Sequence, residues 1–173
     1  MNVRVKDIVL VGMMVAVIEV CKAAFAWIPN IELTSFWIII FTLYLGKRTY
    51  FAMPVFILVE GAVYGINIWW IMYLYVWPLL SFITVRFRKM NSVIGWSLVS
   101  GVFGLLFGLL CSIPYIFIGS FGTDITAGFA TALAWWVAGI PWDIVHGVGN
   151  FIIMLVLYHP ITGIFRNLKN YLE

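Results

Sequence analysis

Residues 8–28, IVLVGMMVAVIEVCKAAFAWI, decide the fold of this chain. A transmembrane helix needs about 20 consecutive, mostly apolar residues to cross the hydrocarbon core of a bilayer, and this run supplies them. Pro29 follows directly and ends the helix, because proline cannot continue the hydrogen-bonding pattern. We therefore predict a first membrane span at residues 8–28.

The rest of the chain has the same character. It is 64% hydrophobic and only 10% charged, with a mean hydropathy of +1.08, which indicates a protein embedded in lipid. Its 173 residues suffice for about six helices of bilayer length, so no separate soluble domain is expected. We predict an all-α membrane protein, a six-transmembrane-helix bundle in a single domain (1–173), with spans at 8–28, 34–45, 50–65, 69–85, 93–118 and 131–158. Residues 119–140, rich in Gly, Ser, Thr and Ala, are compatible with a loop, an interfacial helix or the start of the last span.

The basic residues predict the orientation. Nine of the ten Lys and Arg residues flank the spans on one side of the membrane: Arg4, Lys6, Lys47, Arg48, Arg86, Arg88, Lys89, Arg166 and Lys169. Because cytoplasmic turns carry the excess of positive charge, both termini are predicted to be cytoplasmic. The net charge of +3 and the pI near 9.0 then indicate no nucleic-acid partner. The tenth basic residue, Lys22, lies within the first span.

Ionisable side chains at membrane depth are costly unless they are paired or face a wet cavity, so each is a functional candidate. Glu19 and Lys22 are three residues apart and can pair on one helix face, either as a structural pair or facing a ligand. Two polar stripes follow at helical spacing: Glu60, Tyr64 and Asn67 in the third span, and Asp143, His146 and Asn150 in the last. If the stripes face each other they enclose a polar pocket, whereas purely structural hydrogen bonding is the alternative.

Aromatic residues are abundant, at 18% of the chain with nine Trp. Trp70, Tyr73 and Trp77 share one face of the fourth span and extend below the membrane interface. Together with Trp37, Trp135 and Trp136 they are candidates for the walls of a pocket for a flat or bulky organic molecule. For each residue taken singly, the interfacial aromatic belt of any membrane protein is the alternative.

Small residues mark surfaces of close helix packing. Gly12 and Ala16 form a small-x-x-x-small pair in the first span, and Gly101, Gly104 and Gly108 line the fifth. Such a stripe serves either internal packing or docking of another membrane helix, and the pattern leaves both open.

Familiar catalytic motifs are missing from the sequence. We find no phosphate-binding Gly-rich loop, no His-Glu-x-x-His and no Cys-x-x-Cys, and we assign no chemistry to the isolated Cys21 and Cys111. His146 lacks the second and third ligands that a metal site needs. We therefore expect neither enzymatic activity nor a cofactor or metal.

In architecture the chain resembles the S-components, the substrate-binding subunits of the energy-coupling factor (ECF) vitamin transporters of bacteria. The resemblance covers nearly the whole length, including a short loop after the first helix, a long outer segment before the last, and residues 139–150 of the last helix. In that family an Ala-x-x-x-Ala motif of the first helix docks on a coupling protein. Gly12 and Ala16 match it, with Gly as a departure at the first position. The resemblance also places Asn30 and Glu32 at a gate, and Trp70, Tyr73, Trp77, Asp143, His146 and Asn150 near the ligand.

The function implied is high-affinity binding of a vitamin or vitamin precursor in the bacterial cell membrane. The bundle would deliver its ligand by tilting in the lipid bilayer when docked on a coupling protein and two ATPases. The many aromatic and amide groups favour a cobalamin or corrinoid ligand, with riboflavin-, pantothenate- and pyridoxine-like molecules as alternatives.

Two other classes of protein are the alternatives. A small membrane enzyme acting on a lipid or prenyl substrate would use Glu60, Asp143 and His146 as acids and bases, and would need them within hydrogen-bond reach of one another. A ligand-free structural subunit would use its polar stripes to hold helices together, and predicts a bundle without an outer cavity.

Overall fold

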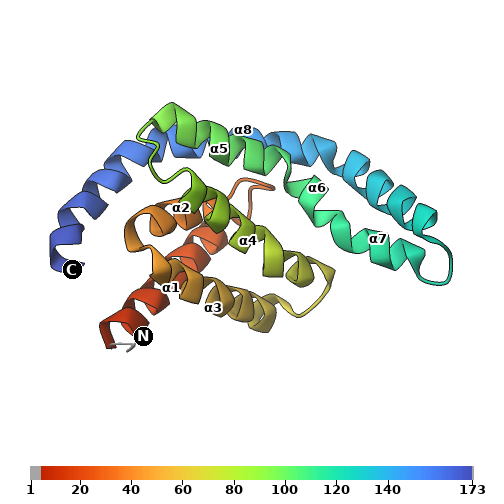
Figure 1. Ribbon diagram of the computed structural model, residues 1–173, viewed down its shortest axis with the longest axis horizontal. Helices are drawn as coiled ribbons and strands as arrows, with labels where there is room; N and C mark the ends of the chain where they lie inside the picture. The colour runs from red at the N-terminus through yellow and green to blue at the C-terminus, as the bar shows by residue number, and fades with distance from the viewer. Residues whose placement is uncertain (1–4, 173) are drawn as a thin grey trace.

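The computed structural model describes the backbone of residues 5–172 and the side chains up to residue 167. Within this part the chain is all-helical, without a strand, which confirms the helical fold class. The helices are α1 (Val5–Phe25), α2 (Thr34–Leu45), α3 (Lys47–Tyr64), α4 (Ile68–Arg86), α5 (Val93–Leu105), α6 (Phe107–Cys111), α7 (Ile113–Ser120) and α8 (Ile125–Leu172) (Figure 1). Arg4 and the side chain of Lys169, used above for the orientation, lie outside the described residues.

Several of these helices are long and apolar enough to cross a membrane. By length and composition α1, α4 and α8 each qualify, and α5 with α6 and α7 forms a fourth candidate, bent by 43°. Helix α2 is apolar but has only 12 residues, fewer than a full crossing requires. The chain is therefore a multi-pass α-helical membrane protein.

The helices form two layers (Figure 1). In the first layer α1 packs on α3 and α2 packs on α4, while in the second the broken helix α5–α7 runs alongside α8. Contacts of α2 with α8 and of α4 with α6 join the layers. Large side chains such as Phe36, Phe56, Trp77 and Trp96 are fully buried between the helices.

Helices α5 and α8 approach so closely that their facing glycines have no room for a side chain. A Cβ on Gly104 would lie 2.8 Å from the Cα of Gly147 and 2.9 Å from the backbone oxygen of His146. A Cβ on Gly108 would overlap the carboxylate of Asp143. The small residues of the fifth predicted span therefore serve internal packing, one of the two uses that the sequence allowed.

Residues 119–140, left open by the sequence, divide into a turn and a helix. Helix α7 ends at Ser120 and α8 begins at Ile125. The carboxylate of Asp124 accepts hydrogen bonds from the Thr126 hydroxyl and the Ala127 backbone N–H, as a helix N-cap does. These bonds hold the pKa of the exposed Asp124 carboxyl below its usual value.

From Ile125 onward α8 is continuous over 48 residues. A straight helix of that length would span ~72 Å, well over twice the thickness of a hydrocarbon core. Pro141 and Pro160 lie inside α8, and the helix arches over the other layer in Figure 1. Proline disturbs the helical hydrogen bonds and is a common cause of such bending.

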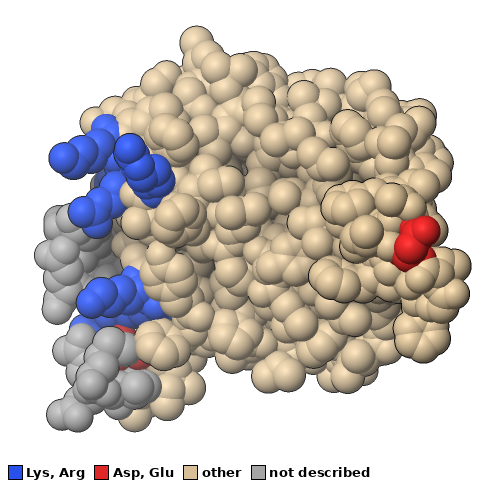
Figure 2. All heavy atoms as spheres, turned by 45° about the vertical axis from the view of Figure 1, so that its right-hand side comes forward, with Lys and Arg blue, Asp and Glu red and all other residues tan. Residues whose placement is uncertain are grey.

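The described basic side chains, apart from Lys22, gather at one end of the molecule. Figure 2 shows the visible Lys and Arg residues on one side, with an acidic side chain partly visible beside them, and another acidic residue at the opposite end. The α2–α3 turn and the α4–α5 loop lie at the same end as both chain termini (Figure 1). At this end Arg48 Nε lies 2.8 Å from Asp7 Oδ1, an ion pair that joins α3 to α1.

Candidate binding pocket

A pocket of about 470 Å³ lies between the two helical layers. Its walls are the last turn of α1, the α1–α2 loop, the end of α3 and the start of α4, closed by Phe107 of α6 and His146 of α8. Because α1 and α3 begin, and α4 ends, at the basic end of the molecule, the pocket lies toward the opposite end. Its volume falls within the range of about 300–1,000 Å³ that is usual for small-molecule sites.

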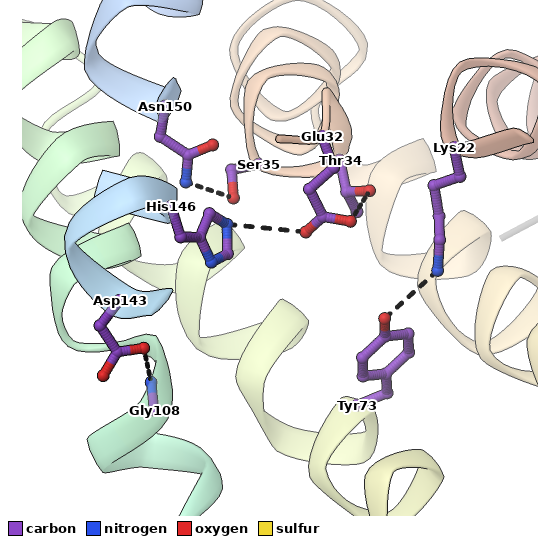
Figure 3. Close-up of polar contacts among 9 residues, drawn as sticks. All are labelled: Lys22, Glu32, Thr34, Ser35, Tyr73, Gly108, Asp143, His146 and Asn150. Atoms are coloured by element: carbon purple, nitrogen blue, oxygen red, sulfur yellow. Dashed lines mark hydrogen bonds and ion pairs between the residues drawn. The ribbon is translucent and has the colours of Figure 1, made fainter. Parts of the chain in front are cut away.

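One wall of the pocket contains an ion pair between helices. Lys22 Nζ lies 2.7 Å from Glu60 Oε1. It also donates a 3.2 Å hydrogen bond to the hydroxyl of Tyr73 (Figure 3). The ammonium group also lies 5.0–5.8 Å from the ring centroids of Phe56, Tyr64 and Tyr73, within the range of cation–π attraction. The charge of Lys22 is thus compensated within the protein.

Glu19 belongs to the same cluster of charges. Its carboxyl group interacts electrostatically with Glu60 as well as with Lys22. The pair expected within the first span is therefore part of a three-residue group, in which the 2.7 Å contact of Lys22 is made to Glu60 on another helix.

The opposite wall brings the α1–α2 loop to α8. Glu32 Oε1 lies 3.7 Å from His146 Nε2, and Glu32 Oε2 accepts a 3.1 Å hydrogen bond from the hydroxyl of Thr34 (Figure 3). His146 is only 3% exposed, and its ring packs edge-on against Phe107. Nε2 of His146 is buried and has no hydrogen bond. Because buried polar atoms normally have a partner, this nitrogen is a candidate contact for a bound group.

A second hollow of about 460 Å³ adjoins the first. The two share several lining residues: Pro29, Asn30, Trp69, Tyr73 and Phe107. The second is lined further by Asp143, whose Oδ1 accepts a 2.9 Å hydrogen bond from the backbone N–H of Gly108. That N–H lies in the first turn of α6, where the break between α5 and α6 leaves amides without helical partners.

The α1–α2 loop closes over α8. Asn30 adopts a positive φ of 57°, a conformation that Asn tolerates better than most residues. Beyond it, the side chain of Ile31 fits against Gly149, where a Cβ would lie 2.6 Å from Ile31 Cδ1. The loop therefore rests on α8 through an apolar contact beside the polar contact of Glu32.

The structure brings together about half of the residues that the sequence nominated. Those that line one or both hollows are Asn30, Glu32, Glu60, Tyr64, Tyr73, Trp135, Asp143 and His146. Those that line neither are Trp37, Asn67, Trp70, Trp77, Trp136 and Asn150.

Each residue of the second group has a structural environment of its own. The Trp37 indole donates to Cys21 Sγ, the Asn67 side chain caps α4, and the Trp70 indole donates to the backbone oxygen of Ile57. Trp77 is fully buried in the core, the Trp136 indole lies beside the carboxylate of Asp143, and Asn150 donates to the hydroxyl of Ser35.

Sequence reasoning missed four aromatic residues that line the hollows: Phe25, Trp69, Phe107 and Trp142. Trp69 and Phe107 each line both hollows, although neither falls on a polar stripe. Their proximity to Trp135 or to the polar groups arises from the packing of different helices, for which the sequence carries no local signal.

Comparison with known proteins adds no template for this pocket. No family model, no curated protein and no solved structure matches the chain. Within the described residues, no three His, Cys, Asp or Glu side chains are grouped so that they could hold a metal ion. The pocket therefore has to be interpreted from its own residues.

Proposed function

We propose that the chain is the substrate-binding subunit of an ECF-type importer for a vitamin or vitamin precursor in a bacterial cell membrane. The observation that carries the proposal is the pocket between the layers, lined by Lys22, Glu32, Glu60 and His146 in a protein that is otherwise strongly apolar. Ionisable groups within membrane helices are costly, and they usually mark the path or the site of a polar ligand.

The charge distribution supports uptake from outside the cell. With the basic end in the cytoplasm, as positive turns favour, the pocket lies toward the outer surface. The proposal includes six crossings, with the short α2 and the more polar α3 as two of them and α5–α7 as one broken crossing. A polar nutrient would then reach the pocket from the external medium.

The energy for import would come from partner proteins. No nucleotide-binding loop is present in the sequence, so two ATPases and a coupling protein are part of the proposal. Gly12 and Ala16 are both exposed on α1, and a Cβ added to Gly12 would meet no atom within 4 Å. This open stripe is suited to close contact with a helix of the coupling protein, on which the bundle would tilt.

The geometry favours binding over the two other classes of protein. An acid–base site would need Glu60, Asp143 and His146 together, but Glu60 pairs with Lys22 and Asp143 with the Gly108 amide. No hydrogen bond joins any two of the three within the described residues. A ligand-free structural subunit is expected to be a bundle without an outer cavity. The presence of the pocket argues against this class.

The test is to purify the intact chain in mild detergent and analyse it by native mass spectrometry. We expect a small molecule bound at one copy per chain, and its uptake by proteoliposomes that contain the chain, a coupling protein and the ATPases. A chain that carries no small molecule and supports no uptake would contradict the proposal.

A further inference from the structure

We infer that the pocket takes a small organic cation with a flat ring, whose protonated nitrogen lies against Glu32 and His146. The inference rests on the proposed function and adds the chemical class of the substrate.

The pocket is lined by more negatively charged than positively charged groups. Two carboxylates, Glu32 and Glu60, face a single ammonium group, that of Lys22. Glu60 and the aromatic rings already compensate the charge of Lys22, and the carboxyl group of Glu19 lies within electrostatic range. An anionic ligand would therefore meet negative charge without a free cation, whereas a cationic ligand would balance Glu32.

Glu32 and His146 form a polar pair that is not closed by a hydrogen bond between them. The 3.7 Å between Glu32 Oε1 and His146 Nε2 is too long for a hydrogen bond. Nε2 of His146 is buried without a hydrogen-bond partner, and Glu32 retains Oε1 after its bond to Thr34 through Oε2. An N–H group of a ligand can donate to Glu32 Oε1. In the neutral His146 tautomer that carries its proton on Nδ1, a second N–H on the same ligand nitrogen can donate to Nε2. Amidinium and primary ammonium groups carry the donors for both.

The remaining walls suit a flat ring. The aromatic side chains that line the pocket are Phe25, Tyr64, Trp69, Tyr73 and Phe107. Such rings attract cations over their faces and stack on flat heterocycles. The volume of about 470 Å³ favours a ligand with one or two rings over the corrinoid expected from composition. The adjoining hollow leaves space for a substituent.

The experiment uses three probes of nearly identical shape and different charge: benzamidinium, benzamide and benzoate. Their binding to the purified intact chain is measured by thermal shift and by isothermal titration. We expect benzamidinium to raise the unfolding temperature and to bind at least about tenfold more tightly than benzamide, the gain of one charge-assisted hydrogen bond. Benzoate is expected not to bind.

The variant Glu32→Gln removes the charge and keeps the shape of the side chain. Its affinity for benzamidinium should fall about tenfold, whereas the matched variant Asp124→Asn, which alters an exposed carboxylate in the α7–α8 turn, should bind as the unmodified chain does. Absence of a benzamidinium shift, tighter binding of benzoate, or full affinity in Glu32→Gln would each overturn the inference.

The charge of the co-purified molecule tests this inference independently of the importer proposal on which it rests. This measurement needs no variant. A neutral or anionic molecule that is also transported would overturn the inference and leave the importer proposal standing. A chain that binds benzamidinium through Glu32 but carries no nutrient and supports no uptake would support the pocket chemistry and overturn the importer proposal.

Discussion

Glu32 of the α1–α2 loop faces His146 of α8 across 3.7 Å, at a point where the loop also rests on α8 through Ile31. The two side chains belong to different layers of the fold, so the contact joins two walls of the pocket, the α1–α2 loop and α8. A change in either residue, or in the contact of Ile31 with Gly149, should therefore affect the closure of the pocket as well as its chemistry.

The packing of the α1–α2 loop on α8 can be tested at Gly149. In Gly149→Val the new side chain would displace Ile31, because even a Cβ would lie 2.6 Å from Ile31 Cδ1. We expect faster hydrogen exchange in residues 26–32, measured by mass spectrometry, and weaker ligand binding. Gly163→Val is the matched control, since a Cβ there meets no atom within 4 Å. Equal exchange in both variants would show that Ile31 does not hold the loop.

Removal of one partner of the buried ion pair should destabilise the protein. Side chains of Lys22 and Glu60 are 14% and 2% exposed, so Lys22→Met leaves a buried carboxylate without its partner. We expect a loss of about 3–5 kcal/mol in the free energy of unfolding, measured by denaturant titration in detergent. The double variant Lys22→Met/Glu60→Met should recover part of this loss, because it removes both charges.

The partly exposed pair of Arg48 and Asp7 provides the comparison for that measurement. Its side chains are 25% and 20% exposed, and such pairs contribute about 1 kcal/mol or less. Arg48→Met should therefore lower the free energy of unfolding much less than Lys22→Met does. Equal losses would mean that the Lys22 pair is screened by water rather than buried.

Because α5 packs closely on α8, the stability of the protein should be sensitive to substitution of Gly104. In Gly104→Ala the added Cβ would meet backbone atoms of Gly147 and His146 at 2.8–2.9 Å, so the helices must separate. Overpacking of this kind costs about 1–3 kcal/mol. Gly12→Ala, on an open face of α1, should leave the unfolding midpoint unchanged or raise it slightly. A neutral Gly104→Ala would show that the two helices lie further apart.

Orientation in the membrane can be tested with single cysteines. After replacement of Cys21 and Cys111, the variants I66C and K89C each place one thiol at an exposed position, in the α3–α4 turn and the α4–α5 loop respectively. In intact cells a membrane-impermeant maleimide should label I66C and spare K89C, as the positive-inside rule requires. The reverse pattern would turn the pocket toward the cytosol and remove the basis for nutrient uptake.

The exposed small residues of α1 make a prediction about assembly. Substitution of both Gly12 and Ala16 by Leu should abolish co-purification with the proposed coupling protein, because large side chains keep a partner helix at a distance. Ligand binding should be retained, since neither residue lines the pocket. Val20→Leu, also exposed on α1, is the control and should leave assembly intact. Unimpaired assembly of the Leu variant would place the docking surface elsewhere.

The sequence by itself determined that this chain is a helical membrane protein. Hydropathy is a property of consecutive residues, and a run of bilayer length needs no knowledge of its neighbours to be recognised. Local signals alone predict a short apolar run at residues 34–45, and α2 begins and ends at the same residues. Ionisable residues inside the spans, such as Glu60, Asp143 and His146, are also recognisable from the sequence alone.

Only the tertiary structure decided which of these side chains meet. Spacing places Trp70, Tyr73 and Trp77 on one face of α4, yet α4 contacts α2, α3, α6 and α7, so that small rotations around it lead to different neighbours. Trp70 bonds to α3, Trp77 enters the core, and Tyr73 alone of the three lines the pocket. Likewise Lys22 lies three residues from Glu19 in sequence but makes its 2.7 Å contact with Glu60, because the crossing of α1 and α3 brings that carboxylate to it. Helix periodicity fixes the relative directions of side chains on one helix, whereas the partner of each is set by how the helices pack.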